Sequence, residues 1–449
     1  MSDKTTVLML TITLLLTTLG TGILYLSRNR DIFSPLPWCA VHYSILFGFR
    51  SLYCLFASGS FIGGSQSDPQ TMASWILALL LAHLGWLTFL IGYTGRLASL
   101  VARWPPPLPR RWSASRAKLV SSLAFAVGLI ALVVFISRAS GGLGQALSTS
   151  RHKLLTSTGT AYLTELSMLV WYGFLASYVA NRGLTALTAT YGVVTVLGLG
   201  VFLGSKALTF TPVLSAIIAR HYLAARVSFR RLIWFFAVVT IAIIPFNAFR
   251  HSVEPQQVVG LTASTLARPG SAIEAVLRRF YGIECLTIIV RETGTTLGYQ
   301  LGATWSPVLF SWIPRSLWDS KPTVSFARVF GETYLGEWFA GTGTAVAPTL
   351  LGDGYVNFHI AGVVLVSYAA GVIVSTLYRY LVARGGVSGT YVYAAMSQYL
   401  LGGFWEGDVA GLLTRSVFRL ALVVAISLLA RTAGGASVQQ GRKVAKRKG

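Results

Sequence analysis

The sequence has 449 residues, of which 54% are hydrophobic and only 11% are charged. Soluble domains carry about 25% charged residues, so this composition excludes a soluble globular protein and predicts an all-α polytopic membrane protein. The formal net charge of +23 comes from 37 Lys and Arg against 14 Asp and Glu. In a membrane protein such an excess is typical of cytoplasmic loops, so it predicts no nucleic-acid partner.

Cysteine and metal-ligand patterns predict neither a disulfide framework nor a metal site. The three cysteines, Cys39, Cys54 and Cys285, are scattered and odd in number. No His, Cys, Asp or Glu cluster has zinc spacing, and the glycine-rich segments lack a phosphate-loop pattern. Asp353 and His359 are close in the chain, but a single pair is too little to predict a metal. We therefore expect no metal and no cofactor.

Apolar runs long enough to cross a hydrocarbon core of about 30 Å predict about eleven transmembrane helices, within limits of about 10–13. The runs lie near residues 5–27, 37–57, 74–97, 117–137, 160–180, 184–203, 206–224, 231–249, 357–378, 387–403 and 412–431. They divide the chain into an N-terminal transmembrane bundle (1–249), a long loop (250–356), C-terminal transmembrane helices (357–431) and a basic tail (432–449).

The positions of lysine and arginine predict the orientation of the chain. The tail carries five cations between Arg442 and Lys448, so we expect it to be cytoplasmic and held against anionic lipid. Outside the long loop, most other cations fall on the same side as the tail when the helices are threaded backwards. The loop 250–356 is therefore predicted to be external, on a multi-pass protein of the cytoplasmic (inner) membrane.

The stretch Trp312 to Pro322, with the sequence WIPRSLWDSKP, combines features that favour a phosphate site at the membrane surface. Its prolines disfavour a regular helix, and its tryptophans favour the membrane–water interface. Arg315 offers a bidentate fork and Lys321 a point charge, both suited to phosphate. The alternative is an interfacial loop whose cations only meet lipid headgroups.

Three residues are candidates for a proton acceptor. Glu284 lies in a predicted helix among apolar neighbours, and desolvation makes a carboxylate a stronger base. It could instead pair with Arg291 or Arg279 and hold its helix in place. Asp353 and His251 are the other two candidates, so the identity of the base stays open from sequence.

Several ionisable residues fall within or at the ends of predicted membrane helices. Such groups are costly in lipid and usually face the protein interior, which makes them candidates for a polar pathway. Arg50 lies deeper in its predicted helix than a residue that anchors a helix at the interface. The five candidate residues are Arg50, His83, Glu165, Lys206 and His221.

Three stretches resemble the O-antigen polymerase family of bacterial oligosaccharide repeat-unit polymerases. The string IPRSLWDSKP resembles the family pattern I-P-R-x-[IL]-W-P-x-K-P, with Asp319 in place of a proline. Gly204-Ser205-Lys206 is similar to a Gly-Ser-Arg segment. The stretch from Pro348 to Phe358 is similar to a segment reading Gly-Glu-x-Tyr-x-Asn-Phe-Gly, with Asp353 for glutamate and His359 for the final glycine. The resemblance covers about residues 200–380.

The resemblance implies a GT-C-like membrane glycosyltransferase of the cell envelope whose donor and acceptor are undecaprenyl-pyrophosphate-linked oligosaccharides. Such an enzyme moves the growing glycan onto a new repeat unit outside the membrane, builds an O-antigen-like polysaccharide of lipopolysaccharide, and releases undecaprenyl pyrophosphate. A chain-length regulator is a further partner that this implies. Cationic side chains can stabilise the departing pyrophosphate without a metal. The residues expected to bind it are Arg315 first, Lys321 second, and Arg250, Arg279 and Lys206 as helpers.

Two other functions fit the same features. One is an O-antigen ligase or another transferase that uses polyprenyl-linked sugars. The other is a non-enzymatic flippase or transporter of the lipid-linked oligosaccharide, which would need cations deep along a central path. The cations of this sequence are concentrated toward one face, which favours a transferase.

The predicted orientation can be tested by cysteine labelling at Ser325 and Ser437 in a variant that lacks the native cysteines. A membrane-impermeant reagent applied to intact cells should label position 325 and leave position 437 unlabelled, because only the former lies in the predicted external loop. The reverse pattern would overturn the orientation.

Overall fold

The structure is a computed structural model that describes residues 3–57, 65, 68–140, 161–202, 206–251, 277, 280–313, 317–318, 320–321, 326–334, 346 and 348–432. Side chains are described within these ranges except at 139–140, 161, 201–202, 206–207, 240, 243–251, 328 and 332. The described residues form helices and connecting turns with no strand, which confirms the predicted all-α class.

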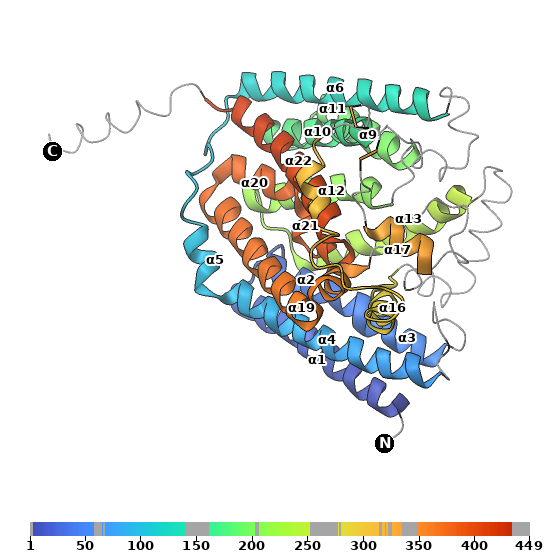
Figure 1. Cartoon of the computed structure of the whole chain (residues 1–449). Coiled ribbons are helices and arrows are strands. Elements are labelled where there is room, and N and C mark those ends of the chain that lie inside the picture. The colour runs from blue at the N-terminus through green and yellow to red at the C-terminus, as the bar shows by residue number, and fades with distance from the viewer. Residues whose placement is uncertain are drawn as a thin grey trace.

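A first group of helices packs around one hydrophobic cluster along the lower part of Figure 1. The long helix α4 contacts α1, α16 and α19, so it forms the centre of this group. The group consists of α1 (Asp3–Asn29), α2 (Pro35–Tyr43), the π-helical turn η1 (Ser44–Phe49), α3 (Arg50–Phe56), α4 (Pro69–Thr94), α5 (Arg96–Val101), α16 (Gly282–Glu292) and α19 (Thr349–Tyr378).

A second group packs around a separate cluster along the upper part of Figure 1. It consists of α6 (Ala114–Ser140), α9 (Ala161–Ser167), α10 (Leu169–Asn181), α11 (Ala186–Leu197), η2 (Gly198–Phe202), α12 (Lys206–Leu223), α20 (Gly386–Ala395), α21 (Ser397–Leu400) and α22 (Val409–Leu429). The remaining elements are α13 (Phe229–His251), η3 (Ser306–Phe310), α17 (Phe326–Tyr334), η4 (Arg379–Arg384) and η5 (Gly403–Glu406). The hairpin and loop described below lie where α19, α22 and η3 meet.

Seven helices in the described part are long and apolar enough to cross a membrane, so the protein is a multi-pass membrane protein. They are Asp3–Asn29, Pro35–Phe56, Pro69–Thr94, Ala114–Arg138, Tyr162–Asn181, Thr349–Arg384 and Val409–Leu429. Each coincides with one of the predicted apolar runs. The runs 184–203, 206–224, 231–249 and 387–403 are helical as well, but their helices are not in this set.

The ends of the helices follow ordinary capping chemistry. The Asp68 carboxylate accepts hydrogen bonds from the backbone N–H groups of Gln70 and Thr71, and Pro69 occupies the first turn of α4. Asp408 caps α22 in the same way through the N–H of Gly411. These caps fix where two of the membrane helices begin.

Helix α19 is two helices folded against each other, so the part of Thr349–Arg384 that can cross a membrane is the longer arm together with η4. Phe358 and His359 have non-helical dihedral angles, and His359 has φ 55° and ψ −141°. A Cβ atom on Gly362 would lie 1.8 Å from the carbonyl oxygen of Gly354. In one straight helix these two residues would be about 12 Å apart, so the chain reverses at 358–359. The short arm 349–357 is buried and the longer arm begins at Ile360.

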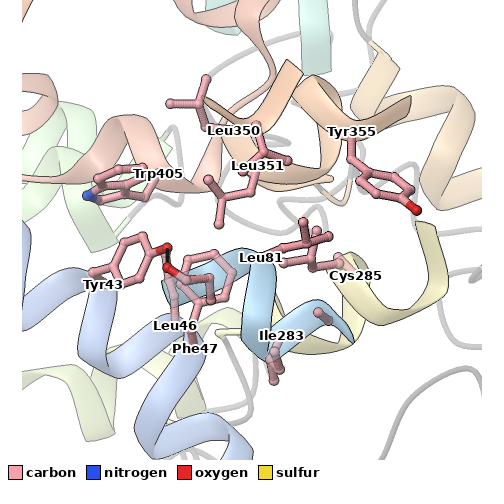
Figure 2. Close-up of a cluster of buried hydrophobic side chains, with 14 of the residues drawn as sticks. Tyr43, Leu46, Phe47, Leu81, Ile283, Cys285, Leu350, Leu351, Tyr355 and Trp405 are labelled. Atoms are coloured by element: carbon pink, nitrogen blue, oxygen red, sulfur yellow. Dashed lines mark hydrogen bonds between the residues drawn. The ribbon is translucent and has the colours of Figure 1, made fainter. Parts of the chain in front are cut away.

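The short arm of this hairpin rests on a cluster of large apolar side chains. Figure 2 shows Leu350, Leu351 and Tyr355 from α19 on one side of the cluster and Tyr43 with Phe47 on the other. Side chains of α4, α16 and η5 complete it. Residues 282–292 and 349–356 belong to the loop predicted to be external, yet both segments are packed into the first helix group.

The contact between the two arms predicts a strong effect of Gly362→Ala. The added methyl group has to push the arms apart, and overpacking of this kind costs about 1–3 kcal/mol or more. We expect a clear fall in the thermal unfolding temperature of the detergent-solubilised protein. Gly20→Ala is the matched control, because a Cβ atom there meets nothing within 4 Å. The control should unfold at or above the wild-type temperature, and equal behaviour of both variants would contradict the hairpin.

Candidate functional site

Several of the predicted pyrophosphate ligands lie outside the described residues. Arg315 and Arg279 are among them, and for Arg250, His251 and Lys206 the structure describes the backbone alone. Arg250 and His251 form the end of α13, and Lys206 is the first residue of α12. Lys321, Glu284 and Asp353 are described in full, and their contacts decide what each of them can do.

Lys321 closes the loop that contains the predicted phosphate site. Its ammonium group donates hydrogen bonds to the carbonyl oxygens of Ser311 at 3.0 Å and Ile313 at 2.7 Å. The residue is buried, so the charge is held by backbone dipoles within the protein. Two of the three donors of a lysine ammonium are thereby committed to the loop's own backbone. Lys321 ties together the two ends of the segment that spans Arg315.

The same loop is fastened to the second helix group and presents apolar side chains to its surroundings. Tyr162 in α9 donates to the carbonyl oxygens of Ser311 and Trp312. Trp312 is 74% exposed and Leu317 is 79% exposed. Large apolar side chains exposed on a loop are typical of surfaces that contact a membrane or a partner, and the interfacial position of this loop stays a prediction.

Asp353 is the hub of a hydrogen-bond network at the hairpin. One carboxylate oxygen accepts from the Thr304 hydroxyl at 2.8 Å and from the Asn357 amide at 3.2 Å. The other accepts from the Trp305 indole at 2.9 Å and from the backbone N–H of Val409 at 2.8 Å. The side chain is fully buried. Four donors thus surround a carboxylate that has no cation among these partners.

Asn357 extends this network to the segment that precedes the loop. Its side-chain oxygen accepts from the backbone N–H of Gly302 at 2.8 Å, and its nitrogen donates to the Thr304 hydroxyl at 2.7 Å. The backbone N–H of Gln300 donates to the carbonyl oxygen of Val356. Residues 300–305 are therefore fixed along the hairpin, and η3 carries the chain from there into the loop closed by Lys321.

Glu284 forms a bidentate ion pair with Arg50 of α3. The guanidinium donates from Nε and Nη2 to the two carboxylate oxygens, each at 2.7 Å, and both side chains are 1% exposed. Arg50 also donates to the carbonyl oxygen of Leu277 and lies over the rings of Tyr53 and Tyr281. The pair joins α16 to the second membrane helix.

These contacts give both described carboxylates structural roles. Glu284 and Asp353 are both buried and their carboxylate oxygens are hydrogen-bonded within the protein, so neither is placed to take a proton from a substrate in this conformation. The sequence offered Arg291 or Arg279 as the structural partner of Glu284, whereas the partner is Arg50. Arg291 instead donates to Glu292 and to the Thr71 hydroxyl.

Glu165, His83 and His221, which were also expected in a polar pathway, contact neighbouring elements, whereas the side chain of Lys206 lies outside the described residues. Glu165 in α9 forms a bidentate pair with Arg419 in α22. The two ring nitrogens of His83 contact the Leu79 carbonyl and the Thr13 hydroxyl, as expected for a histidine bonded to the next helix. His221 lies 3.6 Å from Asp31. Each of these groups joins helices rather than lining a described channel.

Asp31 is a partly buried hydrogen-bond acceptor whose role the sequence did not predict. It follows α1 and accepts hydrogen bonds from the hydroxyls of Tyr222 and Tyr378, which belong to α12 and α19. Burial raises the pKa of its carboxyl, but the His221 ring and the two hydroxyls outweigh this and hold the pKa below its usual value. An isolated aspartate between two helices gives no pattern from which this role could be read.

An apolar cavity of about 370 Å³ lies beside Arg50, between the end of the second membrane helix and residue 277. Its walls are almost entirely apolar, so it is suited to a lipid or isoprenoid segment and not to a sugar. The lining residues are Phe49, Leu52, Tyr53, Phe56, Ala57 and Leu277. Among the described residues, no group of three or more His, Cys, Asp or Glu side chains is arranged to hold a metal ion.

Comparison with known proteins gives no relative on which to base a function. No protein-family model matches the chain, and no characterised protein or solved structure shows detectable similarity to it. The geometry and the sequence motifs are therefore the basis of the functional argument.

The structural role of Glu284 predicts that Glu284→Ala destabilises the protein by about 3–5 kcal/mol, because it leaves Arg50 buried without its partner. Chemical unfolding in detergent measures this. Glu292→Ala is the control: its pair with Arg291 is more exposed, and its loss should cost about 1 kcal/mol or less. If Glu284→Ala kept wild-type stability but lost activity, Glu284 would be catalytic and not structural.

Proposed function

We propose that this protein is a membrane glycosyltransferase that polymerises undecaprenyl-pyrophosphate-linked oligosaccharide repeat units into an O-antigen-like polysaccharide. One observation supports this more than any other. The two motif-bearing segments, 312–322 and 348–358, are parts of one assembly, because Thr304 and Trp305 just ahead of the loop donate to Asp353 in the hairpin. A site for one extended substrate requires such proximity.

Lys321 supports the proposal in a way that differs from its expected role. We infer that it is a positioning residue, because its ammonium group holds the carbonyl oxygens of Ser311 and Ile313. In this proposal, the loop that Lys321 holds at Ser311 and Ile313 preorganises Arg315 for the substrate. A preorganised cation stabilises a developing anion without the cost of reorganisation at the moment of reaction. Arg315 remains the first proposed ligand of the pyrophosphate, with Arg250, Arg279 and Lys206 as helpers.

The reaction is a substitution at the anomeric carbon of the growing glycan. The hydroxyl oxygen of the new repeat unit forms a bond to that carbon while its bond to the pyrophosphate oxygen breaks. Undecaprenyl pyrophosphate leaves with the electron pair, and the hydroxyl proton passes to a base. Because Glu284 and Asp353 have structural contacts, the proposal assigns this proton to His251. Arginine side chains supply the charge opposite the leaving group, so the proposed step is independent of a metal.

The proposal places the enzyme in the cytoplasmic membrane with this site on the external side, in a GT-C-like arrangement of about eleven transmembrane helices. The apolar cavity beside Arg50 offers room for part of an isoprenoid chain. The loop's exposed Trp312 and Leu317 suit the depth at which a lipid-linked pyrophosphate lies.

Arg315→Ala should lower the polymerisation rate about a hundred- to thousandfold, the effect of losing a charge-assisted contact to a developing anion, about 2.7–4 kcal/mol. Arg315→Lys should recover only part of this, because lysine keeps the charge but not the fork. The measurement uses purified protein and defined lipid-linked repeat units, with products separated by chain length. Arg328→Ala is the control in the same loop and should lose much less.

The same assay separates the competing functions. Polymer formed from repeat units alone supports the polymerase. Transfer only onto a lipid A–core acceptor would show a ligase, and movement of the lipid-linked sugar between leaflets without a new glycosidic bond would show a transporter. A well-folded Arg315→Ala variant that polymerises at the wild-type rate would overturn the assignment of Arg315.

A further inference from the structure

His359 occupies the reversal point of the hairpin in a conformation that suits glycine. Its φ of 55° and ψ of −141° lie outside the regions open to ordinary L-residues. Holding a side-chain-bearing residue in such a region is unfavourable and occurs where the surrounding structure enforces it, often at a ligand site. The network around Asp353 and Asn357 is the enforcing structure here, since it fixes the short arm up to the residue before Phe358.

The neighbours of His359 define which of its nitrogens carries the proton. The Tyr355 hydroxyl lies 2.9 Å from His359 Nε2, and Tyr355 is buried. We assign the Tyr355 hydroxyl as the donor and Nε2 as the acceptor, an arrangement that places the proton of a neutral ring on Nδ1. The His359 side chain is exposed, so this Nδ1–H is accessible to a ligand.

The surface around this donor is apolar. Phe358 and Leu301 are exposed, and so is Tyr299, whose ring meets the His359 ring edge to face with centroids 5.9 Å apart. Gly302 lies against Phe358, so residues 299–302 border the reversal point. A hydrogen-bond donor within an exposed apolar surface fits a ligand that joins acceptor oxygens to an apolar chain. It does not fit a free sugar, which has polar groups on every side.

We propose that His359 binds the pyrophosphate of a polyprenyl-linked substrate by donating Nδ1–H to a phosphate oxygen, with Tyr355 as the residue that fixes the tautomer. This inference rests on the proposed function, because it assigns a residue to the substrate of that site.

Replacement by glycine tests the proposal, because it should relax the backbone and remove the donor at once. His359→Gly should unfold at the wild-type temperature or above it and bind undecaprenyl pyrophosphate in lipid nanodiscs about 10- to 100-fold more weakly, the effect of one hydrogen bond to a charged group. His359→Asn keeps an N–H donor at this position, so it should recover part of the binding. Tyr355→Phe should weaken binding a few-fold and change the imidazole ¹⁵N shifts that report the tautomer.

Arg182→Gly is the matched control for relaxed strain, because Arg182 has φ 53° at the end of α10, far from the hairpin. It should keep wild-type binding. Inorganic pyrophosphate is the control for the lipid, and it should bind far more weakly than the lipid-linked form. Equal affinity for inorganic pyrophosphate and undecaprenyl pyrophosphate would show that the lipid chain is not recognised. Wild-type binding by His359→Gly would overturn the role of His359.

The outcomes also separate this inference from the proposed function. Binding that depends on His359, in a protein that makes no polymer, would support the inference and reject the polymerase. Normal polymerisation and normal binding by His359→Gly would support the polymerase and reject the inference.

Discussion

A carboxylate that is removed from water needs a cation or a full set of hydrogen-bond donors, because leaving it without them costs several kcal/mol. Among the few carboxylates of this chain, Glu284 and Asp353 are buried among its helices and Glu165 is partly buried. Glu284 pairs with Arg50, Glu165 pairs with Arg419, and Asp353 is surrounded by four donors. Each solution joins segments that are far apart in the sequence. The positions of α16, α9 and the hairpin therefore depend on how these charges are satisfied.

The two ion pairs and the Asp353 network have different consequences for function. A bidentate pair such as Arg50–Glu284 is neutral overall and joins two elements without influencing the potential at a distance. The Asp353 network uses donors from a loop, from a helix N-terminus and from its own arm, so it determines the position of all three. Because the hairpin reverses just beyond Asn357, this network also fixes the positions of Phe358 and His359 at the reversal. Rigidity at Asp353 is thus a condition for any binding at Phe358 or His359.

The sequence predicted the helices well because hydropathy is a local property. The apolar runs match the helices closely, and even the run beginning at 357 starts next to the longer arm of α19. The reversal at 358–359 was not predicted, since its turn is made by Phe and His and contains neither glycine nor proline. One departure from the resembling family segment falls at this turn. His359 stands where that segment has glycine, and the structure gives His359 backbone angles that glycine adopts readily.

The partners of charged side chains could not be predicted from the sequence for a different reason. Arg50 and Glu284 are separated by more than half of the chain, and composition shows only that cations outnumber carboxylates. Neighbours in sequence, such as Arg291 for Glu284, are the natural guess, but the helix turns them toward Thr71 and Glu292. Ion-pair partners cannot be chosen by closeness in sequence where helices from distant parts of the chain pack together. The depth of Arg50 in its helix was the one available signal.

Arg315 and Lys321 in the loop motif differ in the hydrogen bonds that their side chains can form. A lysine ammonium is compact and donates in three directions, which suits it to hold two carbonyl oxygens of one turn, as Lys321 does. An arginine in that place would direct its planar fork to one side and leave the turn less closed. The fork instead matches the two oxygens of a phosphate group. Under the proposed function the motif thus combines one ligand, Arg315, with one positioning residue, Lys321, and a loop held by Lys321 would limit the entropy lost when the pyrophosphate binds.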